Sequence, residues 1–296
     1  MEKKNSFPLK LLWYIGMSLL AVIMIYPLFF AILGGFNQLS EFTEMGALLP
    51  ISKDPTMEHW VYAFTPNALV PLLNSVLRAT WYTVLITAEA ILMGYVMVRY
   101  EFKGKKFVLS FILVTQVIPG VLTMIPTFVM VSRLPLIGGN DILGRGGHGL
   151  YNNKLILYLQ LGWGSLMCVI LFMMSMKSQP IAFEEAAELD GCGFWKKIWH
   201  VVIPMQKPII TCVMVNNALG NWNDWMTPFM YISDQSKTTL VTYLATLTSA
   251  LKQFGSGKPY PKIFALAVVA MIPPFLIFLF FQKNIVQGIA SAGVKE

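Results

Sequence analysis

The sequence predicts an all-α, polytopic membrane protein with six transmembrane helices, organised as one domain over residues 1–296. Of its residues, 56% are hydrophobic and only 12% are charged, whereas soluble domains carry about 25% charged residues. Apolar runs of about 20–26 residues recur along the chain, and each can cross a ~30 Å hydrocarbon core at ~1.5 Å per residue. Together these observations exclude a soluble domain with a single core.

The first apolar run begins directly after a short basic N-terminus. Its uncharged stretch from Leu11 to Ser40 covers 30 residues, which exceeds the roughly 7–15 residues of a signal-peptide core. We therefore interpret it as an uncleaved span. The six predicted spans are 11–35, 74–98, 107–132, 155–176, 208–231 and 263–282.

Basic residues in the loops set the predicted orientation. With both termini in the cytoplasm, the inside segments hold 13 Lys or Arg and the longer outside loops hold 8, as the positive-inside rule requires. The net charge of +7 is scattered over these loops, which favours membrane orientation over nucleic-acid binding. The loop 133–154 then lies outside, and its GGNDILGRGGHG stretch predicts a flexible turn, because no phosphate-loop GK[ST] follows it.

Span five is the most polar of the six predicted spans. Its residues recur at helical spacing, which predicts one shared polar face lining a water-filled path or a helix interface. The stripe comprises Asn216, Asn217, Gly220, Asn221, Asn223, Asp224 and Thr227. Trp222 and Trp225 flank it, and an aromatic ring beside amide and carboxylate groups suits a sugar. The alternative is interhelical packing, with the tryptophans as an outer-interface belt.

Evidence for catalysis is weak in this sequence. Glu89 is a carboxylate within span two, where it could pair with a polar group on another helix or relay protons. The three cysteines form no CxxC pair, the three histidines lie far apart outside the spans, and no nucleophile–base set is visible. We therefore expect neither an enzyme nor a metal site.

The segment 181–208, IAFEEAAELDGCGFWKKIWHVVIPMQKP, is a charged stretch between two spans. Glu185-Ala186-Ala187, then Gly191, then a run that ends at Pro204 resembles the EAA loop of binding-protein-dependent ABC importer permeases. Further motifs resemble the six-span subunit of maltose-type carbohydrate permeases: Leu73-Asn74-Ser75, Gly94-Tyr95 with Arg99, Trp222-Asn223-Asp224 with Pro228, and the tail from Gln287.

This resemblance implies a type I ABC importer permease fold. The loop 181–204 is then a cytoplasmic coupling helix seated on an ATPase, with the coupling residues Glu185, Ala186, Ala187, Asp190, Gly191 and Pro204. From span five, the substrate-path candidates are Asn217, Asn221, Trp222, Asn223 and Asp224. The loop before the last span supplies candidate contacts to a binding protein, at Gly255, Gly257 and Tyr260, and the tail 288–296 supplies a second ATPase contact.

The implied partners are a second homologous permease, a cytoplasmic ABC ATPase dimer, an extracytoplasmic solute-binding protein and membrane lipid. ATP and Mg²⁺ are expected on the ATPase, with no cofactor on this chain, in a bacterial cytoplasmic membrane. The expected cargo is a sugar or oligosaccharide. A glycerophosphodiester or polyol carried by the same machinery is one alternative. An ion-coupled secondary carrier is another, although it would rely on intramembrane carboxylates and internal repeats, which are not prominent.

Overall fold

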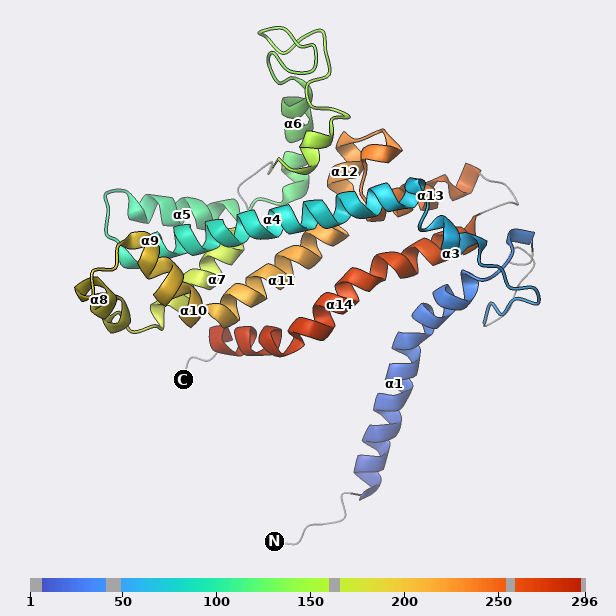
Figure 1. Cartoon of the computed structure of the whole chain (residues 1–296), viewed down its shortest axis with the longest axis horizontal. Helices are drawn as coiled ribbons and strands as arrows, with labels where there is room; N and C mark the ends of the chain where they lie inside the picture. The colour runs from blue at the N-terminus through green and yellow to red at the C-terminus, as the bar shows by residue number, and fades with distance from the viewer. Residues whose placement is uncertain (1–6, 41–48, 160–165, 254–258, 294–296) are drawn as a thin grey trace. The chain divides into compact units, whose positions relative to one another are not determined.

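The structure is a computed structural model that describes residues 7–40, 49–159, 166–253 and 259–293. The described residues form helices and connecting loops (Figure 1). The helices are α1 (Phe7–Gly34), α3 (Glu58–Tyr62), α4 (Pro66–Arg99), α5 (Lys105–Thr115), α6 (Gly120–Ser132), η1 (Lys154–Leu157), α7 (Leu166–Lys177), α8 (Ala182–Leu189), α9 (Phe194–Lys197), η2 (Ile198–Val202), α10 (Ile203–Met205), α11 (Lys207–Asn223), α12 (Met226–Tyr231), η3 (Gln235–Lys237), α13 (Leu240–Ser249), η4 (Ala250–Gln253) and α14 (Tyr260–Gly293).

Three described helices, α1, α4 and α14, are long and apolar enough to cross a membrane. They coincide with the first, second and sixth predicted spans. Three bent helix pairs raise the number of candidate spans to six if each pair counts as one. The predicted third span, 107–132, is not one continuous helix, because α5 and α6 meet at an angle of 99°. Pro119 precedes α6 with ψ of 128°, and a proline cannot donate a helical hydrogen bond and disfavours the helical conformation in the residue before it.

The fourth and fifth predicted spans also differ from single helices. The fourth, 155–176, begins in η1, and its long helix α7 begins at Leu166, while 160–165 lie outside the described residues. The fifth, 208–231, is divided into α11 and α12, because Asp224 adopts an extended conformation with ψ of 94°. The polar residues of this span therefore cannot all lie on one helix.

The chain forms two compact units, one of residues 1–70 and 243–272 and the other of residues 71–242 and 273–296. The core of the second unit joins α4, α7 and α11, with one residue from α5 and two from η2 (Figure 1). Tyr95 and Phe172 are among its largest fully buried side chains. Gly94 permits this packing, because an added Cβ would lie 2.7 Å from the Phe172 ring. The core lies toward the ends of α4 and α11 that adjoin the segment 181–204.

In the first unit, α3 packs against α13 and the start of α14. The Tyr62 and Tyr243 hydroxyls lie 2.7 Å apart, and the Lys262 ammonium lies 4.1 Å from the centroid of the Tyr62 ring. Only 6% of the most apolar window of α1 is buried within the chain. This helix therefore presents apolar surface to its surroundings along most of its length.

The glycine-rich loop after α6 is an ordered structure, so the prediction of a flexible turn is wrong. Asn140 donates to the Ser132 and Leu134 carbonyls at 3.0 and 2.9 Å and accepts from the Gly147 N–H at 2.9 Å. Gly149 has a φ of +59°, and a Cβ there would lie 2.3 Å from the Val131 carbonyl oxygen. The glycines allow a close backbone crossing that the Asn140 amide then stabilises.

We predict that the first unit loses stability in mild acid through His59 in α3. Burial of the imidazole is the largest of the effects that hold the pKa of His59 below its ordinary value of 6.5, and the Lys262 ammonium adds to it. Neither ring nitrogen has a partner in the described structure. As the pH falls, the unfolded chain binds the proton before the folded chain does. The contribution of neutral His59 to stability is therefore complete above about pH 6.5 and is lost below it.

Thermal unfolding of the purified chain between pH 7.5 and 5.5 tests this prediction. The melting temperature of the wild type should fall with pH more steeply than that of His59→Gln. His148→Gln, which replaces an exposed imidazole, is the matched control and should retain the wild-type slope. Equal slopes for the wild type and His59→Gln would contradict the assignment.

Candidate functional site

The first candidate site is the coupling segment, residues 181–204. It consists of short helices that turn sharply from the spans beside them: α8 lies at 81° to α7, and the run Phe194–Met205 lies at 84° to α11. Helix α8 buries Glu184 and Ala187 and exposes Glu185 and Ala186. A segment at right angles to its flanking spans lies near the membrane plane, where it can contact another protein.

A buried carboxylate holds α8 to the end of α4. The Tyr95 hydroxyl donates to Glu184 Oε2 at 2.9 Å, and Arg99 Nε donates to Glu184 Oε1 at 2.7 Å. Arg99 also donates to the Gln179 carbonyl at 3.2 Å, before α8 begins. Sequence reasoning placed Arg99 and Tyr95 in a motif and missed Glu184. Its signal was the Glu184-Glu185 pair, because two consecutive residues of a helix point about 100° apart and cannot both face the same partner.

Glu185, the carboxylate predicted for coupling, is exposed on α8. It lines a cavity of ≈ 160 Å³ together with Tyr95, Arg99, Tyr100, Ile181, Glu184, Glu188 and Lys197. Two of these acids are neutralised within the chain, Glu184 by Arg99 and Glu188 by Lys197. No partner for the Glu185 side chain occurs in the part of the chain that the structure describes. Its charge is therefore available at the mouth of the cavity.

The turn after α8 requires Gly191. Its φ is +78°, and an added Cβ would meet no atom within 4 Å, so the backbone conformation alone selects glycine here. The Gly191 and Cys192 N–H groups donate to the Glu188 and Ala187 carbonyls at 3.0 and 2.9 Å. These bonds close the end of α8. The remaining coupling candidates, Asp190 and Pro204, are both exposed.

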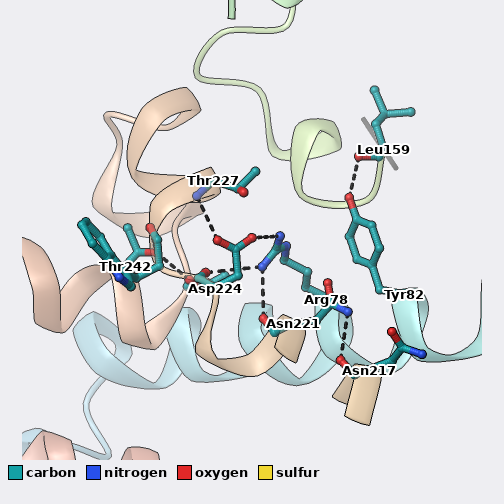
Figure 2. Close-up of polar contacts among 10 residues, drawn as sticks. Arg78, Tyr82, Leu159, Asn217, Asn221, Asp224, Thr227 and Thr242 are labelled. Atoms are coloured by element: carbon teal, nitrogen blue, oxygen red, sulfur yellow. Dashed lines mark hydrogen bonds and ion pairs between the residues drawn. The ribbon is translucent and has the colours of Figure 1, made fainter. Parts of the chain in front are cut away.

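The second candidate site is formed by Arg78, Asn217, Asn221, Asp224 and Thr227 (Figure 2). It is called the outer polar cluster because it lies at the end of α11 that is predicted to face outward. Arg78 on α4 is 3% exposed and pairs with the Asp224 carboxylate at 2.6 Å, beyond the end of α11. It also donates to the Asn221 carbonyl at 3.1 Å. The other Asp224 oxygen accepts from the Thr227 N–H at 3.1 Å, at the start of α12. The break in the fifth span is thus held by an ion pair and by a hydrogen bond from the first turn of α12.

The predicted polar stripe divides between this cluster and the exposed surface. Asn217 is buried and donates to the Val213 carbonyl at 2.9 Å and to Cys168 Sγ at 3.3 Å, while Asn221 donates to the Asn217 carbonyl at 2.9 Å. Trp222 is only 4% exposed, so in this conformation its ring presents no open face. Asn223 is exposed. Asp224 and Thr227 lie past the end of α11, which corrects the expectation of a single helix face.

The remaining predicted positions lie apart from both sites. Tyr260 is half-buried at the start of α14, where its ring stacks on Phe264 with centroids 6.3 Å apart. Gly255, Gly257 and the tail 294–296 fall outside the described residues, and the side chains from 284 onward are likewise not described. Glu89 lies half-buried in α4. No group of His, Cys, Asp or Glu side chains within the described residues is placed to hold a metal ion.

Comparison with known proteins points to one family. Residues 90–291 match the family described as "Binding-protein-dependent transport system inner membrane component". The chain is 26% identical to the arabinooligosaccharides transport system permease protein AraQ of Halalkalibacterium halodurans, with 100% of both chains covered. It is 25% identical to the maltodextrin transport system permease protein MalD of Streptococcus pneumoniae, covering 100% of this chain and 98% of that one.

A solved structure shares the fold. A chain of a bacterial ABC transporter involved in the import of the acidic polysaccharide alginate superposes with a TM-score of 0.76, covering 96% of this chain and 98% of that chain. A second structure of an alginate ABC transporter, in complex with an alginate pentasaccharide-bound periplasmic protein, gives a TM-score of 0.59. The two are 18% and 17% identical in sequence, so they show the fold alone.

We predict that Asp224→Asn destabilises the protein, because it leaves the buried Arg78 charge without its counter-ion. Breaking a buried ion pair from one side costs about 3–5 kcal/mol, whereas replacing both members with apolar residues is often neutral. The double variant Arg78→Met/Asp224→Met should therefore recover most of the lost stability. The measurement is the thermal unfolding of the full chain in detergent.

Asn223→Ala is the control for this test, because it truncates an exposed neighbour and should leave the melting temperature unchanged. If Asp224→Asn had the melting temperature of the wild type but a lower rate of transport, the ion pair would not contribute to the stability of the chain. Asp224 would then act in the substrate path.

Proposed function

The chain belongs to the family of binding-protein-dependent transport system inner membrane components, and from this premise we propose that it is the permease subunit of an ATP-driven oligosaccharide importer. The match along its whole length to permeases named for oligosaccharide transport carries this proposal. The chain is not an enzyme, and ATP hydrolysis takes place in a separate partner. Substrate crosses the membrane by alternating access of a pore shared with a second permease of the same kind.

The coupling segment supports the ATPase as the cytoplasmic partner. Helix α8 offers a thin face at Ala186 and an unneutralised carboxylate at Glu185, next to a cavity that a partner side chain can enter. The Glu184–Arg99 pair joins α8 to α4, so a displacement of α8 moves a helix of spanning length. In this way closure of an ATPase dimer can reach the pore as a rigid-body change. ATP and Mg²⁺ belong to the ATPase, with both termini of this chain on its side of the membrane.

On the outer side, a solute-binding protein delivers the sugar, in contact with the loop before α14 that includes Gly255, Gly257 and Tyr260. The structure of a transporter with a bound periplasmic protein supports this type of partner. The exposed amide of Asn223 and the outer polar cluster supply groups that can bond hydroxyls along the path. A neutral sugar suits this region, because Arg78 already has a carboxylate partner in Asp224.

Uptake in cells that lack this chain tests the function. We expect the deletion to abolish uptake of one labelled oligosaccharide among arabino-, malto-, galacto- and chito-oligosaccharides, and plasmid-borne wild type to restore it. ATP depletion should stop this uptake, whereas a protonophore at constant ATP should not. Loss of glycerophosphodiester or polyol uptake instead would support the same machinery with a different cargo. Uptake that follows the ion gradient would support a secondary carrier.

We predict different outcomes for the two neighbouring carboxylates of α8. Glu185→Gln removes a charge that faces the ATPase, and should weaken ATPase binding about tenfold, the equivalent of ~1.4 kcal/mol, without changing the stability of the chain. Glu184→Gln leaves Arg99 with a neutral partner, and should lower the melting temperature of the isolated chain. Co-purification of the ATPase and thermal unfolding measure the two effects separately.

Glu101→Gln serves as the control, because this residue is an exposed acid on the same side of the membrane. It should alter neither quantity. Normal ATPase binding by Glu185→Gln, or a destabilised Glu185→Gln chain, would contradict the roles given to these two residues.

A further inference from the structure

The coupling segment contains a second element that lies near the membrane plane. Helices α9, η2 and α10 form a continuous run, Phe194–Met205, which meets α11 at an angle of 84° across Gln206. Because α11 enters the membrane directly from this junction, a run at right angles to it lies at the level of the lipid headgroups on the cytoplasmic side. This placement requires that α11 crosses the membrane, and does not depend on the substrate carried.

The two faces of this run differ sharply. One face is buried, with Ile198 and Val202 in the core and the Lys197 ammonium paired with Glu188. The opposite face exposes Trp195, which is 59% accessible, and Trp199, which is 64% accessible. The two indoles are one helical turn apart, on the same side. Lys196 and His200 are exposed beside them.

The neighbouring helix α8 has the opposite chemistry, although it packs against α9 and η2. Its exposed polar side chains are Glu185 and Glu188, of which Glu188 pairs with Lys197, and the exposed Asp190 follows at its end. An acidic face with a small residue at Ala186 suits a groove on a protein. A basic face with two large amphipathic indoles suits the interface of a bilayer, where tryptophan is enriched and lysine is attracted to anionic headgroups.

We propose that the exposed face of Phe194–Met205, formed by Trp195, Lys196, Trp199 and His200, is a binding surface for anionic phospholipid of the cytoplasmic leaflet. The indoles enter the headgroup region, and the Lys196 ammonium pairs with lipid phosphate. Lys207, exposed at the start of α11, extends the positive surface toward the bilayer. The α9–α10 run thereby fixes the height of α8 relative to the membrane while α8 remains free for the ATPase.

Fluorescence quenching by brominated lipid tests this proposal on the full chain in nanodiscs. Two bilayers contain phosphatidylglycerol and phosphatidylcholine in equal amounts, with bromine near the headgroup on one lipid or on the other. The signal is the wild-type emission minus that of Trp195→Phe/Trp199→Phe, which conserves aromatic packing. We expect this difference emission to be quenched in both brominated bilayers, and more strongly when phosphatidylglycerol carries the bromine. Lys196→Gln should remove that preference.

Trp222→Phe is the control, because it removes a buried indole. The wild-type emission minus that of Trp222→Phe should be the same with and without bromine. The measurement is then repeated on the complete complex with its ATPase, where quenching should persist. An unquenched difference emission, or quenching that disappears when the ATPase binds, would overturn the proposal and assign this face to the ATPase. Equal quenching by the two brominated lipids would overturn the preference for anionic lipid.

Discussion

The pairing of Glu184 with Arg99 is the interaction on which the arrangement of the segment 181–204 depends. The carboxylate is buried, so it needs a counter-charge and hydrogen-bond donors, and it receives both from Arg99 and Tyr95 of α4. These bonds join the short helix α8 to a helix of spanning length, α4. Without them, α8 would reach the spans only through its flanking turns and through its packing on α9 and η2.

A second ion pair lies farther along the same helix. Arg78 is 21 residues before Arg99 on α4, about 32 Å away at ~1.5 Å per residue, and it pairs with Asp224 at the break between α11 and α12. One helix thus carries two arginines, one bonded to the coupling segment and one to the interrupted fifth span. Each arginine pairs with a carboxylate of the same chain, which lowers the cost of placing its charge in or near a membrane.

Residue spacing in the sequence predicts some features of the fold, whereas periodicity and composition failed for others. The EAA-like spacing from Glu185 to Pro204 predicts a coupling segment, and the positive φ of Gly191 explains why glycine stands within it. Helical periodicity failed in span five, because it presumes an unbroken helix and α11 ends at Asn223. The glycine-rich loop looked flexible by composition. The Asn140 amide, whose three hydrogen bonds cross the loop, orders it.

Composition and charge by themselves determined that this chain is a helical membrane protein with a soluble segment before its fifth span. These properties follow from the cost of placing polar groups in lipid, which acts on each segment separately. The tertiary structure alone decided that Glu184 rather than Glu185 is the buried acid, that Arg78 neutralises Asp224, and that Trp222 is enclosed while Trp195 and Trp199 are exposed. Those outcomes depend on which side of a helix meets a neighbour distant in sequence, and no local pattern contains that information.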